Sequence, residues 1–106
     1  MALTRHFKET LGARAERDPA YVRAMLDEAV TLFLTGDSDT AKVVLRDVIN
    51  ATMGFETLAA KVRKPSKSLH RMLSRSGNPT MENLSAILGA MQKVLRVQIK
   101  AVVKAA

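Results

Sequence analysis

A proline that separates two short helical patterns, within residues 54–73, constrains the fold more than any other feature of the sequence. In the first pattern Leu58, Ala59 and Val62 recur at helical spacing, so they share one apolar face of a short helix. Pro65 disfavours the α conformation at the residue before it. The first helix must therefore end, and the chain must turn, before a second helix begins.

The second pattern has the two faces expected of a helix that lies on the surface. Ser66 and Ser68 suit the start of a helix, where a side-chain oxygen can accept from a free backbone N–H. Leu69, Met72 and Leu73 point to one side. The residues left for the other side are Ser66, Lys67, His70 and Arg71. A short helix with a basic outer face, set on a small partner helix, fits the DNA major groove. The sequence thus predicts a helix-turn-helix unit.

Positive charge is concentrated in the half of the chain that contains this unit. Residues 1–54 hold seven Lys/Arg and eight Asp/Glu, whereas residues 55–106 hold ten and two. Lysines and arginines that replace condensed counterions on phosphates supply most non-specific affinity for a polyanion. Those at residues 61–75 are expected to form a single convex ridge that can face a duplex. The alternative is a solvated basic face without a nucleic-acid partner.

The composition excludes several other classes of protein. The chain has 106 residues and is expected to be a single domain, 1–106. It has no cysteine, so disulfides and thiolate metal sites are excluded, and its two histidines do not complete a zinc site. No apolar run reaches the length of a membrane span, and a cytoplasmic protein is expected. A nucleophile, a base and an orienting group do not occur together, so an enzyme is not expected.

Capping signals divide the rest of the chain into helical segments. Asp18 before Pro19 is a strong helix start, and Gly36 is expected to end that helix. Asp37, Ser38 and Asp39 supply the expected cap of the next helix, and Thr80 is the expected cap of a later one. The segments are an N-terminal helix at 1–17, a helical hairpin at 18–53, the helix-turn-helix at 54–74, and a loop and closing helix at 75–92. The inward-facing residues of the closing helix are predicted to be Met81, Leu84, Ile87, Leu88 and Met91.

The C-terminal residues change period. Within residues 95–103, apolar side chains alternate with Arg96, Gln98 and Lys100, which predicts a β-strand. A helix that runs on from Lys93 is the alternative. A single strand presents unpaired N–H and C=O groups, which invites the same strand of a second subunit or the edge of another protein's sheet.

Several motifs together resemble a known family. They are Gly54 with Leu58-Ala59, the run from Ser68 to Ser74, Gly77-Asn78-Pro79, and residues 84–91. From about residue 25 to about residue 100 the chain resembles the lambda-repressor-like (xenobiotic-response-element) helix-turn-helix regulators, in particular the compact bacterial addiction-module antidote proteins. The resemblance implies an all-α fold, a compact bundle of five to six helices with a central helix-turn-helix, to which a short C-terminal β-strand used in dimerisation can be added.

The resemblance also assigns roles to individual residues. It would place at base edges the side chains of Ser66, Lys67 and Arg71, with Ser68 and His70 beside them. It would place at backbone phosphates Phe55, Thr57, Lys64, Arg75, Ser76 and Asn78. Arg71 could present its fork to guanine O6 and N7, and Lys67 could contact guanine or phosphate. The alternative is that both are ordinary solvated helix residues. The family usually has glycine where this chain has Arg63, at a turn position that often needs a positive φ.

The function predicted from these features is sequence-specific DNA binding by a transcriptional regulator. A repressor that acts as a homodimer on a pseudo-palindromic operator in double-stranded DNA is expected. The resemblance adds a toxin protein as a second partner, because the family includes antidotes of toxin-antitoxin pairs. The alternative is a toxin-neutralising protein-interaction module without significant DNA binding. No cofactor, metal or membrane partner is expected.

Overall fold

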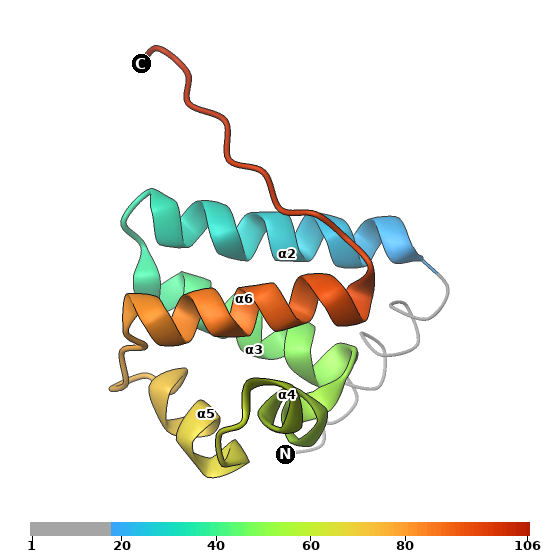
Figure 1. Cartoon of the computed structure of the whole chain (residues 1–106). Helices are drawn as coiled ribbons and strands as arrows, with labels where there is room; N and C mark the ends of the chain where they lie inside the picture. The colour runs from blue at the N-terminus through green and yellow to red at the C-terminus, as the bar shows by residue number, and fades with distance from the viewer. Residues whose placement is uncertain (1–17) are drawn as a thin grey trace, which may run out of the picture.

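The computed structural model describes residues 18–106, which form five α-helices and no β-strand (Figure 1). The helices are α2 (Pro19–Leu34), α3 (Ser38–Ala51), α4 (Gly54–Val62), α5 (Ser66–Met72) and α6 (Met81–Leu95). The predicted all-α class is therefore confirmed. The predicted helix at residues 1–17 lies outside the described residues. None of the five helices is long and apolar enough to cross a bilayer.

The hairpin of α2 and α3 begins and turns where the capping signals predict. The Asp18 side chain accepts from the Tyr21 N–H at 3.2 Å, and Pro19 is the first residue of α2. Gly36 follows the helix with φ +97°, a conformation that favours glycine. Asp37 then caps α3 by accepting from the backbone N–H three residues further on, at 3.2 Å. The start and the turn of the hairpin are thus set by local chemistry, and α4, α5 and α6 pack on this base (Figure 1).

The turn between α4 and α5 contains a residue in the left-handed conformation. Arg63 has φ 56° and ψ 46°, and the Lys64 N–H donates to the Ala59 carbonyl at 3.1 Å. Pro65 is extended, and α5 begins at Ser66. Positive φ costs glycine little, but it costs an L-residue with a side chain about 1 kcal/mol or more. The predicted need for positive φ in this turn is confirmed, and the chain meets it with an arginine.

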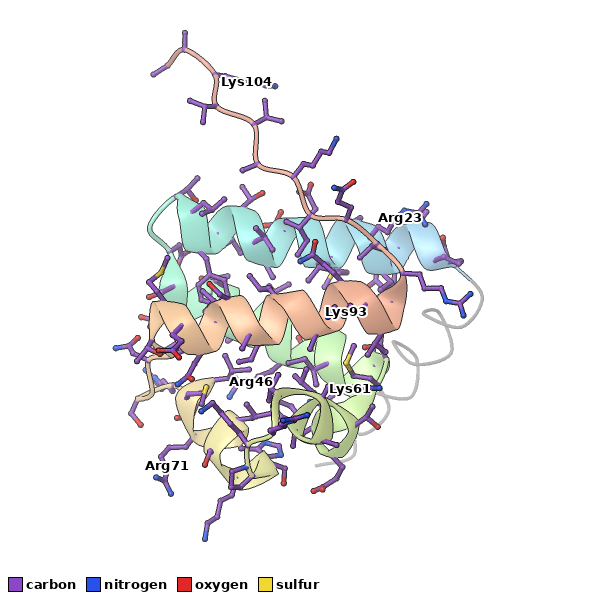
Figure 2. The ribbon with its side chains drawn as sticks, in the orientation of Figure 1. Arg23, Arg46, Lys61, Arg71, Lys93 and Lys104 are labelled. Carbon is purple, nitrogen blue, oxygen red and sulfur yellow. The ribbon has the colours of Figure 1, made fainter. Side chains whose placement is uncertain are left out.

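The pair of α4 and α5 and the C-terminal residues lie at opposite ends of the molecule (Figure 1). The molecule measures 42 × 29 × 26 Å along its principal axes. Figure 2 shows Arg71 of α5 extending away from the body at one end, and Lys104 at the other. The two ends are therefore accessible independently of each other.

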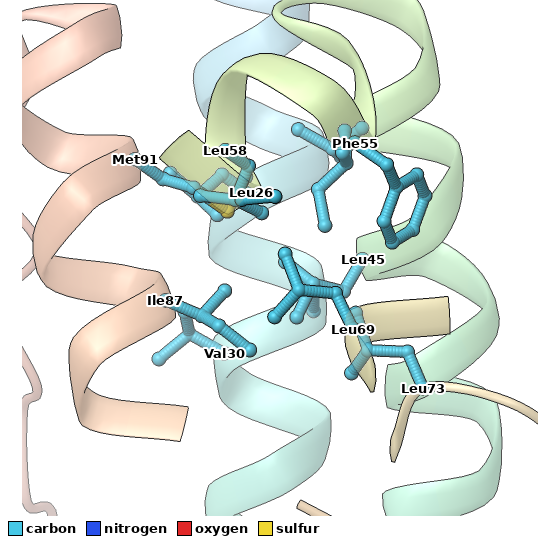
Figure 3. Close-up of a cluster of buried hydrophobic side chains, with 13 residues drawn as sticks. Leu26, Val30, Leu45, Phe55, Leu58, Leu69, Leu73, Ile87 and Met91 are labelled. Atoms are coloured by element: carbon cyan, nitrogen blue, oxygen red, sulfur yellow. The ribbon is translucent and has the colours of Figure 1, made fainter. Parts of the chain in front are cut away.

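The core is formed by side chains from all five helices (Figure 3). The largest fully buried side chains are Leu45 and Ile49 of α3, Leu58 of α4, Leu69 of α5, Leu73 just after it, and Ile87 and Met91 of α6. A helix as short as α5, seven residues, is unstable alone. It is held in place because burial of Leu69 and Leu73 stabilises it by about 1.5–3 kcal/mol per side chain.

One residue of the predicted core is outside it. Met81 is 79 % exposed, although the same helix buries Ile87 and Met91 as predicted. Met81 is the first residue of α6, and Leu84, one turn later, is the first that packs against the buried cluster. The apolar period is correct, but the helix begins one turn before it reaches the core.

The C-terminal strand predicted at residues 95–103 is wrong for this chain. Leu95 is the last residue of α6, Arg96 turns the chain with φ 56°, and residues 97–106 have no regular structure. The alternation in sequence has another cause. Val97 and Ile99 pack against the core while the residues between and after them are exposed, as in an extended segment that crosses helices. The Ile99 N–H donates to the side chain of a glutamine in α6, not to another strand.

Candidate nucleic-acid interface

The outer face of α5 is exposed and basic. Lys67, His70 and Arg71 are exposed, while Leu69 and Leu73 are fully buried beneath them. No ion pair within residues 18–106 engages these three side chains. The predicted division of this helix into two faces is confirmed. What remains on the surface is a short helix on which the cationic groups of Lys67 and Arg71 are free to meet an anion.

The two serines of α5 are less available than predicted. Ser66 is half-buried and its hydroxyl donates to Glu56 Oε1 at 2.9 Å, which joins the start of α5 to the start of α4. Ser68 is also half-buried. Thr57 is exposed, as predicted for a phosphate contact.

The Phe55 side chain, predicted to face backbone phosphates, lies in the core and not on the surface. It is only 5 % exposed. Its ring stacks on His70, with centroids 3.9 Å apart and planes inclined by 21°. This contact packs the first turn of α4 against the outer part of α5. Phe55, Leu58, Ala59 and Val62 occupy positions i, i+3, i+4 and i+7, so the helical period of the sequence already placed Phe55 on the buried face.

The loop after α5 exposes three of the predicted phosphate contacts. Arg75, Ser76 and Asn78 are all exposed. The backbone of this loop is fixed from below by Lys42 of α3, which is only 2 % exposed. Its ammonium group donates to the carbonyls of Arg75 and Gly77 and lies 3.5 Å from an Asp39 carboxylate oxygen. A buried ammonium group needs such partners, and here three oxygens surround it.

The role of Lys42 was not predicted, although the sequence contains a signal for it. Lys42 lies three residues before Leu45 and seven before Ile49, so it falls on the buried stripe of α3. A lysine on such a stripe either extends to solvent or finds oxygen partners. The partners come from a loop more than thirty residues later, so they could not be identified from the local sequence.

Gly77 allows that loop to pack against the end of α5. A Cβ atom at this position would overlap the Arg71 carbonyl. The Gly77 N–H donates to the Ser74 carbonyl at 3.1 Å, and the Ser74 hydroxyl donates to the Arg71 carbonyl at 2.7 Å. The backbone that carries Arg71 and the backbone that carries Arg75 are therefore held in a fixed relation.

The remaining lysines and arginines of residues 61–75 do not all lie on this surface. Lys64 is half-buried in the turn. Lys61 and Arg63 are exposed at the end of α4 but line a groove against α6, together with Lys93. The predicted single convex ridge is therefore wrong: residues 61–75 contribute to two surfaces. The convex one consists of Lys67, His70, Arg71 and Arg75, and we call it the α5 face.

No group of three or more metal-ligating side chains occurs in residues 18–106, and every buried polar side-chain atom in that part of the chain has a hydrogen-bond partner. Comparisons of the chain with protein-family models, with curated proteins and with solved structures gave no match. The described residues are thus identified as a small all-helical domain of five helices.

Proposed function

We propose that this protein is a lambda-repressor-like helix-turn-helix regulator that binds a specific sequence of double-stranded DNA and acts as a repressor. The observation that supports this most strongly is the α5 face. A short helix exposes Lys67, His70 and Arg71 at one end of the molecule, and its apolar side is anchored in the core. Such a helix can enter the major groove, where base edges carry a distinct pattern of donors and acceptors.

The roles proposed for the side chains follow from their chemistry. Arg71 presents its guanidinium fork to O6 and N7 of a guanine, and Lys67 contacts a guanine or a phosphate. Arg75, Ser76 and Asn78 contact phosphates, which positions α5 but carries no sequence information. Lys42 supports these contacts because it fixes the backbone of their loop.

The protein is proposed to act as a homodimer on a pseudo-palindrome. A helix of seven residues reaches only a few base pairs, so two half-sites are needed for an operator that is unique in a genome. The end of the chain favours self-association, because Val102 and Val103 are 75 % and 97 % exposed on an extended segment. Deletion of residues 101–106, which leaves the core intact, is expected to halve the mass measured by light scattering. An unchanged mass would exclude pairing through this segment.

Selection of duplexes from a random pool, followed by gel shifts over a salt series, tests DNA binding directly. We expect a preferred sequence that is bound at least about a thousandfold more tightly than random duplex. Its affinity should fall steeply as salt rises. Arg23→Ala, which removes one charge from the exposed face of α2, serves as the control and should weaken both duplexes only slightly. If no duplex shifts at low salt, the proposal fails.

The second candidate is a protein-interaction module, with a toxin protein as its partner, that does not bind DNA significantly. The exposed valines at the end of the chain favour it, because an extended segment can add a strand to another protein's sheet. The salt series separates the two candidates, since only the first requires a shifted duplex.

A further inference from the structure

A groove of about 530 Å³ lies between the end of α4 and α6, separate from the α5 face. The apolar part of its lining, which we call the floor, consists of the small residues Ala86, Gly89 and Ala90 of α6 together with Val62 of α4 and Val94 of α6. Its rim carries the exposed cations Lys61 and Arg63 of α4 and Lys93 of α6. Figure 2 shows Lys61 and Lys93 on these two helices.

Gly89 has no evident function in the packing of the described residues. It lies within a helix of 15 residues, where glycine is less stable than alanine. A Cβ atom added to it would meet nothing within 4 Å, in contrast to Gly77, where a Cβ would overlap backbone. Its φ is not positive either, unlike that of Gly36 or Gly54. The effect of this glycine is to leave open space above the floor of the groove, where another chain can approach closely.

The charge around the groove indicates what can occupy it. None of the residues that line it is acidic, and the nearest acid along the same face of α6, Glu82, lies one turn before the floor and outside the groove. A two-fold interface with a second copy would bring this patch against itself, so Lys61, Arg63 and Lys93 would face like charges. A nucleic acid would satisfy the rim but gain nothing from a floor of small apolar groups. An occupant with both carboxylates and small apolar side chains satisfies both parts.

We propose that this groove is a docking site for an acidic amphipathic helix of a partner protein. Carboxylates of that helix pair with Lys61, Arg63 and Lys93, and its alanine-sized or branched side chains pack over Gly89. The groove and the α5 face use different residues. The protein can therefore hold the partner helix and a duplex at the same time, and the partner would be brought to the DNA.

The test uses the full chain and a defined probe. The probe is a fluorescein-labelled peptide of about 18 residues, long enough to form helix, with glutamates on one face and alanine and leucine on the other. Its counterpart has lysine in place of every glutamate. Fluorescence anisotropy at low salt should show binding of the acidic peptide only. Gly89→Leu, which fills the groove, and Lys93→Glu, which reverses its charge, should each weaken binding at least about tenfold.

Two control variants separate the groove from general effects. Arg23→Glu makes the same charge change as Lys93→Glu on the exposed face of α2, and should weaken peptide binding less than about twofold. Gly89→Ala adds only a methyl group and should keep most of the binding. Thermal unfolding should show that neither variant of Gly89 is less stable than the wild type, because the added atoms enter open space within a helix.

Several results would overturn the proposal. They are no binding of the acidic peptide, equal binding of its lysine counterpart, or equal losses in Lys93→Glu and Arg23→Glu. A lower molecular mass of Gly89→Leu in light scattering would assign the groove to contact between copies of this chain. An equal loss of duplex and peptide binding in Gly89→Leu would assign it to DNA.

Discussion

The α5 face and the groove between α4 and α6 are both basic, but they differ in shape and in the residues beneath the charges. On the α5 face, Lys67 and Arg71 stand on a convex helix whose base is buried leucine. In the groove, Lys61 and Lys93 accompany an apolar lining of alanine, glycine and valine residues. A convex cationic surface fits the major groove of a duplex, whereas a concave one with an apolar floor fits a protein helix. Net charge alone therefore does not identify the partner.

The two surfaces also depend on different parts of the structure. The α5 face relies on the loop after α5, which packs closely against that helix at Gly77. Lys42 of α3, more than thirty residues earlier in the chain, holds the backbone of this loop. The groove relies only on the packing of α4 against α6. Substitutions in the loop should therefore affect DNA binding and leave the groove unchanged.

The largest effect is expected for Gly77→Ala. The added Cβ overlaps the Arg71 carbonyl, so the loop must move away from α5, and the free energy of unfolding should fall by about 3 kcal/mol. Urea unfolding measures the change. DNA affinity should be lost under conditions in which the folded variant still binds the acidic peptide. Gly89→Ala is the matched control and should unfold at the same or higher urea concentration. Equal destabilisation of the two variants would contradict the close approach of Gly77 to α5.

The second-largest loss of stability is expected for Lys42→Met. Methionine fills the space of the lysine stem but leaves the carbonyls of Arg75 and Gly77 without their donor, which costs about 2 kcal/mol of unfolding free energy. Lys93→Met makes the same substitution at an exposed position. It is the stability control and should change the free energy of unfolding little. Chemical denaturation and a duplex-binding assay measure the two consequences. A Lys42→Met variant with wild-type stability and DNA affinity would show that the ammonium group does not hold the loop.

A smaller effect of opposite sign is expected for Arg63→Gly. Relief of the left-handed strain exceeds the extra chain entropy of glycine, so stability should rise by about 0.5 kcal/mol. Because Arg63 lines the groove, affinity for the acidic peptide should fall while duplex affinity changes little. Arg63→Ala removes the same charge but keeps the strain, so it should lose peptide affinity without becoming more stable. A loss of duplex affinity as large as the loss of peptide affinity would place Arg63 on the DNA-binding surface.

The helices could be predicted because their limits are set by neighbouring residues. Asp18, Asp37 and Thr80 accept from backbone N–H groups three residues later, and Pro65 separates α4 from α5. Such signals are local, so they can be read without the tertiary structure. The positive φ at residue 63 is also a local property of a tight turn, and it was expected from the glycine found there in the family that the sequence resembles.

The features that were not predicted depend on contacts between distant segments. The alternation after Leu95 matches a strand, but the partner of the extended segment is the helical core, which the period alone cannot reveal. The partners of Lys42 come from a distant loop. The division of the basic residues into two surfaces follows from the position of α6 beside α4. Phe55 differs from these, because its position three residues before Leu58 on the apolar face of α4 is a local signal of burial.

The most direct test of the DNA-binding account compares Arg71→Ala and Arg75→Ala on the preferred duplex and on random duplex. Arg71→Ala should lose about 1–3 kcal/mol of binding free energy, confined to one base pair of the preferred sequence. Arg75→Ala should weaken binding to both duplexes alike. It should also reduce the slope of log affinity against log salt concentration by about one, as expected for the loss of one phosphate contact. If the two variants lose the same affinity on both duplexes, α5 does not read base edges and the account of this surface is wrong.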